Sequence, residues 1–236
     1  MQKLMSIMRS AIDDYNMIEE NDVIAVGVSG GKDSISLLCG LNGLSKFYPK
    51  SFKIKAITID PCFNNEPGDF ESIRRYCLDN NIEYIVKQTE LYHIIFETRK
   101  ENNPCSLCSR MRRGLLHDAA IENGCNKIAL GHNKDDVCET FMMNLLSGGT
   151  ISCFSPVSYL SRKNLYMIRP LIYAEERDTI SAVNRLSLPV VESSCPVNEK
   201  TDREKMKKLI CELDKEHPAL ENKIINALQK AHISNW

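Results

Sequence analysis

Few of the features that mark membrane, secreted or nucleic-acid-coating proteins occur in this sequence. No apolar run approaches the roughly 20 residues needed to span a bilayer. Residues 1–14 contain neither a continuous apolar segment nor a small-residue cleavage site, so we expect no secretory signal, a cytoplasmic location and no membrane partner. The 30 basic and 31 acidic side chains leave a net charge of −1. This balance excludes a strongly basic coat but not a local basic patch.

Internal repeats and low-complexity linkers are also lacking, and the composition is that of a globular protein. Of 236 residues, 43% are hydrophobic and 26% are charged, which excludes the disordered and fibrous classes. The length suits one large domain, or one domain with a small appendage.

Short apolar runs alternate with amphipathic stretches along most of the chain. The pattern predicts strands at residues 23–28, 53–60, 83–87, 127–130 and 166–168. It predicts helices at residues 33–44, 69–80, 108–123, 135–146 and 175–186. The alternation indicates an α/β fold in which a parallel sheet is sandwiched by helices.

Helical segments flank this α/β region at both ends. Leu4, Met8 and Ile12 lie on one apolar stripe of an N-terminal helix, which either packs on the sheet or forms a homodimer face. Two C-terminal helices are predicted at 201–213 and 219–231. Six basic and six acidic side chains between residues 199 and 216 indicate a solvated salt-bridge surface. The expected parts are an N-terminal helix (1–20), a central domain (21–197) and a C-terminal helical segment (198–236).

A glycine turn follows the first predicted strand and opens a helix. It reads Ser29-Gly30-Gly31-Lys32-Asp33-Ser34. Glycines let backbone N–H groups approach an anion, the helix N-terminus adds partial positive charge, and Lys32 can neutralise phosphate. Asp33 would repel a phosphate unless it faces a metal ion or a helix N–H group. The motif is not a Walker loop, because Val26 occupies the position of its first glycine. A turn that merely needs glycine is the alternative.

The glycine turn resembles the PP-loop of the ATP pyrophosphatase superfamily, whose fold is adenine nucleotide alpha-hydrolase-like. Members cleave ATP between the α and β phosphates and adenylate a carbonyl oxygen of their substrate. A second matching loop reads Gly131-His132-Asn133-Lys134-Asp135-Asp136, and in the superfamily it lies beside the PP-loop. Its adjacent carboxylates could hold Mg²⁺, contact the reacting substrate, or only cap the helix.

This resemblance implies a nucleotide site at the carboxyl edge of the sheet, where Asp60 ends the second predicted strand. The implied ATP-binding residues are Val28, Ser29, Gly30, Gly31, Lys32, Asp33, Ser34, Asp60, Gly131 and His132. The carboxylates expected to take part in catalysis are Asp33, Asp135 and Asp136.

Ten cysteines are an unusual number for a chain in a reducing compartment. Cys105 and Cys108 form a CxxC pair, which the residues alone leave open to three interpretations. A zinc site would need two further ligands, a thioredoxin-like dithiol usually follows the first strand, and an iron–sulfur cluster would use both thiolates. The cysteines expected to be packing residues are Cys39, Cys62, Cys77, Cys125, Cys138, Cys153 and Cys211.

The surroundings of the CxxC pair carry a more specific resemblance. The segments CSLCSRMRRG, KIALGHNKDD, FMMNLLSGG, IRPL and EHP resemble the tRNA 2-thiocytidine synthetase family over most of the chain. The resemblance implies that ATP activates the 2-carbonyl of an anticodon-loop cytidine in tRNA, and that sulfur replaces its oxygen. It also implies a [4Fe–4S] cluster held by Cys105, Cys108 and Cys195, which would take part in catalysis, together with Mg²⁺ and a cysteine desulfurase as sulfur donor.

One position departs from the family pattern, and the charge around the CxxC pair bears on RNA binding. Family members carry a second CxxC at the distant site, where this chain has Asn198 in place of the last cysteine. Between residues 99 and 113, five basic side chains stand against one acidic side chain. The expected RNA-binding residues are Arg110, Arg112 and Arg113, with Arg162, Lys163 and Arg169 as further candidates.

Two other functions stay open at this point. The near-neutral charge and Asn198 allow sulfur insertion into another RNA base or a small molecule. A nucleotide-binding iron–sulfur redox sensor would bind ATP without forming AMP. Thionucleoside analysis of RNA separates sulfur insertion elsewhere from cytidine thiolation in tRNA. Release of AMP and pyrophosphate excludes the redox sensor.

Overall fold

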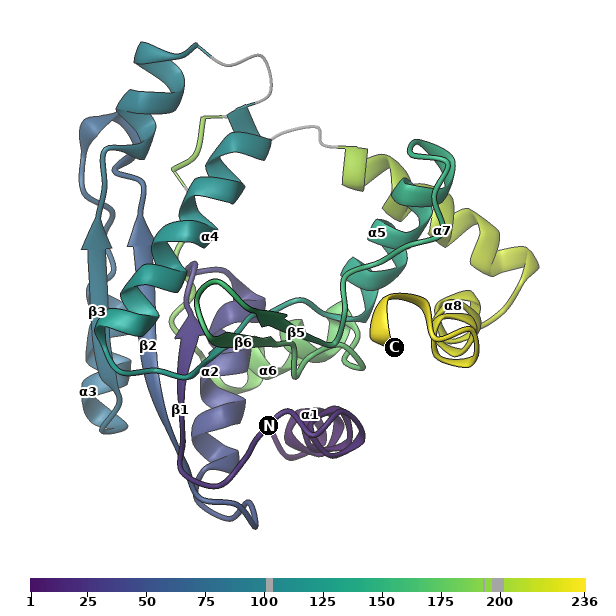
Figure 1. Cartoon of the computed structure of the whole chain (residues 1–236), viewed down its shortest axis with the longest axis horizontal. Helices are drawn as coiled ribbons and strands as arrows, with labels where there is room; N and C mark the ends of the chain where they lie inside the picture. Colours follow the sequence, from purple (N-terminus) through teal and green to yellow (C-terminus); the bar gives the residue numbers. More distant parts are fainter. Residues whose placement is uncertain (101–103, 193, 197–201) are drawn as a thin grey trace.

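A six-stranded sheet in the order β3-β2-β1-β4-β6-β5 forms the centre of the computed structural model (Figure 1). The structure describes all residues except 101–103, 193 and 197–201. The strands are β1 (Asp22–Gly27), β2 (Phe52–Asp60), β3 (Glu83–Gln88), β4 (Lys127–Ala129), β5 (Val157–Leu160) and β6 (Leu165–Ile168). The neighbours from β3 to β6 pair in parallel, and β5 is antiparallel to β6. The predicted parallel sheet is confirmed.

All five predicted strands are present, and β5 is one that the sequence analysis missed. It has four residues and lies at the end of the strand order, so one side of its backbone has no partner strand in the described part of the chain. Its exposed Tyr159 packs against the exposed Tyr166 of β6, with ring centroids 4.8 Å apart and the rings tilted by 38°. A short edge strand buries too little apolar surface to give a clear period-two pattern.

Helices cover both faces of the sheet. They are α1 (Gln2–Asp14), α2 (Lys32–Leu44), α3 (Glu71–Asp79), α4 (Pro104–Glu122), α5 (Lys134–Leu146), α6 (Glu176–Leu186), α7 (Asp202–Glu216) and α8 (Leu220–Lys230), with short turns η1 (Phe63–Asn65), η2 (His93–Thr98) and η3 (Ile233–Asn235). Successive strand residues point to opposite faces, so Ala25 and Ile57 pack with Leu116 of α4 while Ile24 and Val26 join the core on the other face. Within the described residues, no helix combines the length and apolarity that crossing a bilayer requires.

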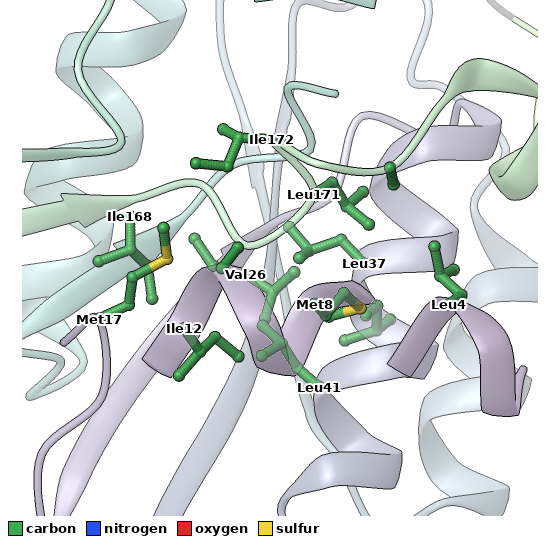
Figure 2. Packing of buried hydrophobic residues seen from close by; sticks show 14 of the residues in the cluster. Leu4, Met8, Ile12, Met17, Val26, Leu37, Leu41, Ile168, Leu171 and Ile172 are labelled. Carbon is green, nitrogen blue, oxygen red and sulfur yellow. The ribbon is translucent and has the colours of Figure 1, made fainter. Parts of the chain in front are cut away.

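The terminal helices belong to the same core as the sheet. Leu4, Met8 and Ile12 of α1 pack against Leu37 and Leu41 of α2 (Figure 2). The apolar stripe of α1 is therefore buried, and it does not form an exposed homodimer face. From the C-terminal end, the same cluster includes Ile210, Ile224, Ile225, Leu228 and Trp236. The three expected parts of the chain thus share one hydrophobic cluster.

The carboxyl ends of the parallel strands bring the functional loops together. The chain leaves β1 through residues 28–31 into α2, and leaves β4 through residues 130–133 into α5. β1 and β4 are direct neighbours in the sheet, so these two loops lie side by side. Ligands bind at such an edge in open parallel sheets.

Candidate nucleotide and thiol site

The PP-loop forms a closed turn at the N-terminus of α2. The Ser34 hydroxyl accepts from the Ser29 N–H at 3.2 Å and donates to the Gly31 carbonyl at 2.8 Å. Gly30 has φ +92°, a conformation that residues with a Cβ rarely adopt. Gly31 is the N-cap of α2, and because glycine has no side chain it offers no side-chain acceptor to the first N–H groups of the helix. Such a helix end favours an anion.

Gly131 allows the second loop to approach the PP-loop closely. A Cβ at this position would lie 3.1 Å from the Ser34 nitrogen and 3.1 Å from the Asp33 carbonyl carbon. Asn133 then begins α5 with a reciprocal cap: its side chain accepts from the Asp136 N–H and the Asp136 carboxylate accepts from the Asn133 N–H, both at 3.0 Å. The expected adjacency of the two loops is present, and Asp136 does cap the helix.

Asp33 is held by three side chains. Its Oδ1 accepts from the Thr179 hydroxyl at 2.6 Å and from the Asn133 amide at 3.4 Å, and its Oδ2 pairs with the Lys32 ammonium at 3.0 Å. Lys32 also pairs with Glu176 at 2.9 Å. These contacts explain how a carboxylate is accommodated beside a phosphate-binding loop. Thr179 and Glu176 were not identified from the sequence, because their place at the start of α6 carries no motif.

The adjacent carboxylates of α5 have separate partners. Asp135 accepts from the Glu176 N–H at 2.7 Å, and Asp136 pairs with Arg203 of α7 at 2.7 Å. Burial raises the pKa of both carboxyl groups above the usual value. A bound cation would relieve this cost, so the donor set fits Mg²⁺. Arg203 is a second site-adjacent residue that the sequence did not reveal.

A small cavity of about 190 Å³ opens next to the PP-loop. Val28, just after β1, and Ser29 of the PP-loop line it, together with His132 from the second loop and Arg112 and Arg113 from α4. Its apolar wall comes from Ile57, Ile59, Leu116 and Leu130. An apolar slot beside a helix N-terminus suits a nucleoside whose phosphates lie on the loop.

Asp60 does not line this cavity. Its carboxylate is 2% exposed and accepts from the Cys62 N–H at 3.0 Å and the Gly68 N–H at 2.9 Å. Asp60 therefore shapes the loop that follows β2, and the structure does not place it against the nucleotide cavity.

Cys105, Cys108 and Cys195 line one cavity of about 360 Å³. The rings of Phe63 and Phe96 line it as well. Burial raises the pKa of the Cys108 thiol, and the nearby Arg112 guanidinium opposes that rise. In the described part of the chain, no group of three His, Cys, Asp or Glu side chains is arranged to hold a metal ion. The residue types nevertheless fit a [4Fe–4S] cluster, because three thiols line one cavity together with a cation.

The two cavities share a wall. Ser29 of the PP-loop and Arg112 of α4 line both the nucleotide cavity and the three-cysteine cavity. Ser109, one turn of α4 before Arg112 and next to the CxxC pair, does so too. The sequence placed these residues in separate motifs, and the fold places the motifs next to each other.

The remaining candidates divide between surface and core. Arg110 is exposed on α4, whereas Arg169 is buried, which removes it from the expected RNA-binding surface. Lys163 pairs with Asp118. Cys77, Cys125 and Cys138 are buried as expected, and Cys39, Cys62 and Cys153 are half-buried. Cys211 is exposed on α7, so its expected packing role is wrong. Asn198 lies outside the described residues.

A family model described as a PP-loop domain matches residues 3–213. A tRNA-cytidine(32) 2-sulfurtransferase of Pelobacter propionicus is 38% identical over 98% of this chain and 86% of its own length. The protein of that name from Geobacter sulfurreducens is 38% identical over 96% of this chain and 89% of its own length.

Two solved structures are similar to this chain over most of its length. The U34-tRNA thiolase NcsA from Methanococcus maripaludis, with its [4Fe-4S] cluster, matches with a TM-score of 0.76 and 25% identity, over 96% of this chain and 77% of its own. The NH3-dependent NAD synthetase from Campylobacter jejuni shares the fold at a TM-score of 0.53 and 16% identity, over 97% of this chain and 93% of its own. The chain belongs to the PP-loop proteins and, within them, to the tRNA-cytidine 2-sulfurtransferase family.

Proposed function

We propose that this chain uses ATP to replace the 2-oxygen of an anticodon-loop cytidine in tRNA by sulfur. The observation that carries the proposal is the wall shared by the nucleotide cavity and the three-cysteine cavity, formed by Ser29 and Arg112. A base activated at the first cavity would lie within reach of sulfur supplied from the second. The name of the relatives, which specifies cytidine 32, supports that nucleotide as the target.

The first step is adenylation of the base. The cytidine 2-oxygen attacks the α-phosphorus of ATP, and the bond from that phosphorus to the bridging oxygen of pyrophosphate breaks. The N–H groups at the start of α2 and the Lys32 ammonium would bind the phosphate oxygens. Lys32 now pairs with Asp33 and Glu176, so phosphate would compete with these carboxylates for the same cation.

We assign Mg²⁺ to the carboxylates at the start of α5. Asp135 and Asp136 supply oxygen ligands beside the PP-loop, and Mg²⁺ is bound in nucleotide sites by one or two carboxylates together with substrate phosphates. Asp33 would remain a positioning group for Lys32, because Thr179 and Asn133 already bind its Oδ1.

The second step exchanges AMP for sulfur. The 2-carbon gains a bond to sulfur and loses its bond to the original oxygen, which departs on AMP. A [4Fe–4S] cluster held by Cys105, Cys108 and Cys195 would supply an iron without a protein ligand, at which sulfide can bind. Arg112 would balance negative charge on both sides of the shared wall, and Phe63 and Phe96 would keep water from the activated base.

The partners follow from this chemistry. A cysteine desulfurase is the proposed source of sulfur, together with a thiol reductant that releases its persulfide sulfur as sulfide. The cytoplasm is the proposed location, and exposed Arg110 with Arg113 is the proposed contact to the tRNA backbone. A homodimer would have to use a surface other than the apolar stripe of α1, which is buried.

The test is anaerobic purification followed by quantitation of iron and sulfide, combined with thionucleoside analysis of RNA from a deletion strain. We expect about four irons per chain in the wild type, loss of iron in Cys195→Ala, and no loss in the matched control Cys211→Ala. Complementation should restore 2-thiocytidine with the wild type and the control, but not with Cys195→Ala.

The outcomes separate the competing functions. An unchanged 2-thiocytidine level in the deletion strain would reject cytidine thiolation in favour of another base or a small molecule. ATP binding without release of AMP and pyrophosphate would indicate a sensor. An iron-free wild type after anaerobic reconstitution would remove the cluster from the proposal.

A further inference from the structure

A buried arginine lies behind the nucleotide cavity. Arg169 follows β6 and is 5% exposed, and among the described residues its guanidinium forms no ion pair with a carboxylate. Its Nη1 donates to the Ser155 carbonyl at 2.5 Å and the Ser158 hydroxyl at 3.4 Å, and its Nη2 contacts the Met167 sulfur at 3.9 Å. Burying a cation without an anion costs free energy, so the residue is expected to serve something other than stability.

The Nε–H donor of Arg169 is directed at His132. Its Nε lies 3.3 Å from the His132 Nδ1. The sheet creates this contact, because Ala129 of β4 pairs with Ile168 of β6 and both chains then leave the sheet at the same edge. The Phe154 ring fixes the two groups, with its centroid 5.0 Å from that of His132 and 4.9 Å from the Arg169 guanidinium carbon.

The contact determines where the imidazole proton lies. A guanidinium has five N–H donors and no acceptor, so the His132 Nδ1 must present its lone pair to Arg169. The proton of the neutral ring is then on Nε2. We propose that Arg169 is a positioning residue that holds His132 as a neutral Nε2–H donor to an anionic oxygen bound in the nucleotide cavity. The identity of that oxygen, on the α-phosphate of ATP or of the adenylated base, rests on the proposed function.

The surroundings of His132 favour the neutral ring. Burial, followed by the charges of Arg169, Arg203 and Arg113, lowers the pKa of His132 to about 3. Among the described residues, the charged groups that act on the ring are these three cations, which come from the segment after β6, from α7 and from α4. A ring that is neutral and already accepts at Nδ1 cannot take a further proton during the reaction, so His132 donates a hydrogen bond and does not act as a general base.

The direct test is ¹⁵N NMR of the full chain labelled at histidine, without substrate or cluster chemistry. The sequence has five histidines, and loss of one signal in His132→Gln identifies the relevant ring. We expect its chemical shifts to report a neutral Nε2–H ring throughout about pH 5 to 8. A ring protonated on Nδ1, or one that titrates with a midpoint above about 6, would overturn the proposal.

A second test replaces the arginine. In Arg169→Met we expect the His132 titration to move towards its ordinary midpoint of about 6.5, and the affinity for a non-hydrolysable ATP analogue at about pH 8 to fall roughly tenfold. Arg169→Lys keeps a cationic donor and should recover part of both effects. The exposed Arg9 of α1 provides the matched control, since Arg9→Gln should change neither.

The two readouts separate positioning from a merely structural role. Weaker nucleotide binding in Arg169→Met with an unchanged His132 spectrum would overturn the proposal. If Arg169→Met does not fold, the wild-type spectrum and Arg169→Lys still decide the matter. An unchanged 2-thiocytidine level in the deletion strain would reject the proposed function while leaving the NMR result intact, so the two failures are distinguishable.

Discussion

The hydroxyl of Thr179 links α6 to the PP-loop, and its removal gives a measurable loss. Thr179 is fully buried and donates to Asp33 Oδ1 at 2.6 Å. Its single proton cannot also serve the Glu176 carbonyl, which lies 2.9 Å away. Thr179→Val keeps the shape of the side chain and removes the donor, leaving the Asp33 carboxylate with Asn133 and Lys32 as its partners.

The expected magnitude follows from the environment of the bond. A hydrogen bond to a charged group contributes about 1.5–3 kcal/mol. The Asp33 side chain is 26% exposed, so water partly replaces the lost donor and we expect the lower end, about 1.5 kcal/mol. Thr179→Ser is the matched variant, because it keeps the hydroxyl and loses only a buried methyl group, worth about 0.8 kcal/mol. The valine variant should therefore be the less stable of the two.

Urea denaturation of both variants gives the free energies of unfolding, and titration with an ATP analogue gives the effect on the loop. We expect Thr179→Val to bind the analogue more weakly than the wild type, since Asp33 no longer holds Lys32 in one orientation. The reasoning fails if Thr179→Val is as stable as Thr179→Ser and binds the analogue equally well, because the bond to Asp33 would then contribute nothing.

Two further predictions concern other buried carboxyl groups. Burial, followed by the charge of Asp136, raises the pKa of Glu139 from its ordinary value of 4.5 to about 7. Between these values the folded state binds more protons than the unfolded state, so the contribution of Glu139 to stability falls as pH rises through that window. In Glu139→Gln, thermal midpoints measured across the window should lose this part of their pH dependence, and an unchanged profile would contradict the assignment. Asp22 pairs with the buried Lys127 at 2.8 Å and accepts a hydrogen bond from the Asn126 amide at 2.6 Å. Asp22→Asn should lower the free energy of unfolding by about 3–5 kcal/mol, because it leaves a buried ammonium without its anion. A decrease below about 1 kcal/mol in urea denaturation, the size expected for an exposed pair, would show that the pair is solvated.

The sequence predicts correctly those elements whose own residue pattern indicates one local structure. The β-branched run of β1 and the glycines of the PP-loop each indicate one local structure, and both are present. The edge strand β5 was missed because it has only four residues and none of them is fully buried. Asp60 was expected in the nucleotide site from its place at the end of β2, but the loop that follows uses its carboxylate for two backbone N–H groups.

The residues missed in the site share one property: they reach it from elements distant in the sequence. Thr179 and Glu176 contact the PP-loop from α6, and Arg203 contacts Asp136 from α7. Pairings of this kind depend on how helices cross the sheet, and no spacing within a single segment encodes them. The sequence analysis names Arg169 as a candidate for RNA binding. The structure shows that it is buried and that it contacts His132 instead.

Arg112 lines both cavities, so its charge can act on a ligand in either one. Its charge opposes the rise in the pKa of the Cys108 thiol, and it also lines the nucleotide cavity. A free energy of interaction between two sites acts equally in both directions. We therefore expect ligation, oxidation or deprotonation of the thiols to change the affinity for nucleotide, and nucleotide to change the affinity of the thiols for their ligand by the same factor. Nucleotide affinities measured on protein with differently occupied thiols refer to different chemical species.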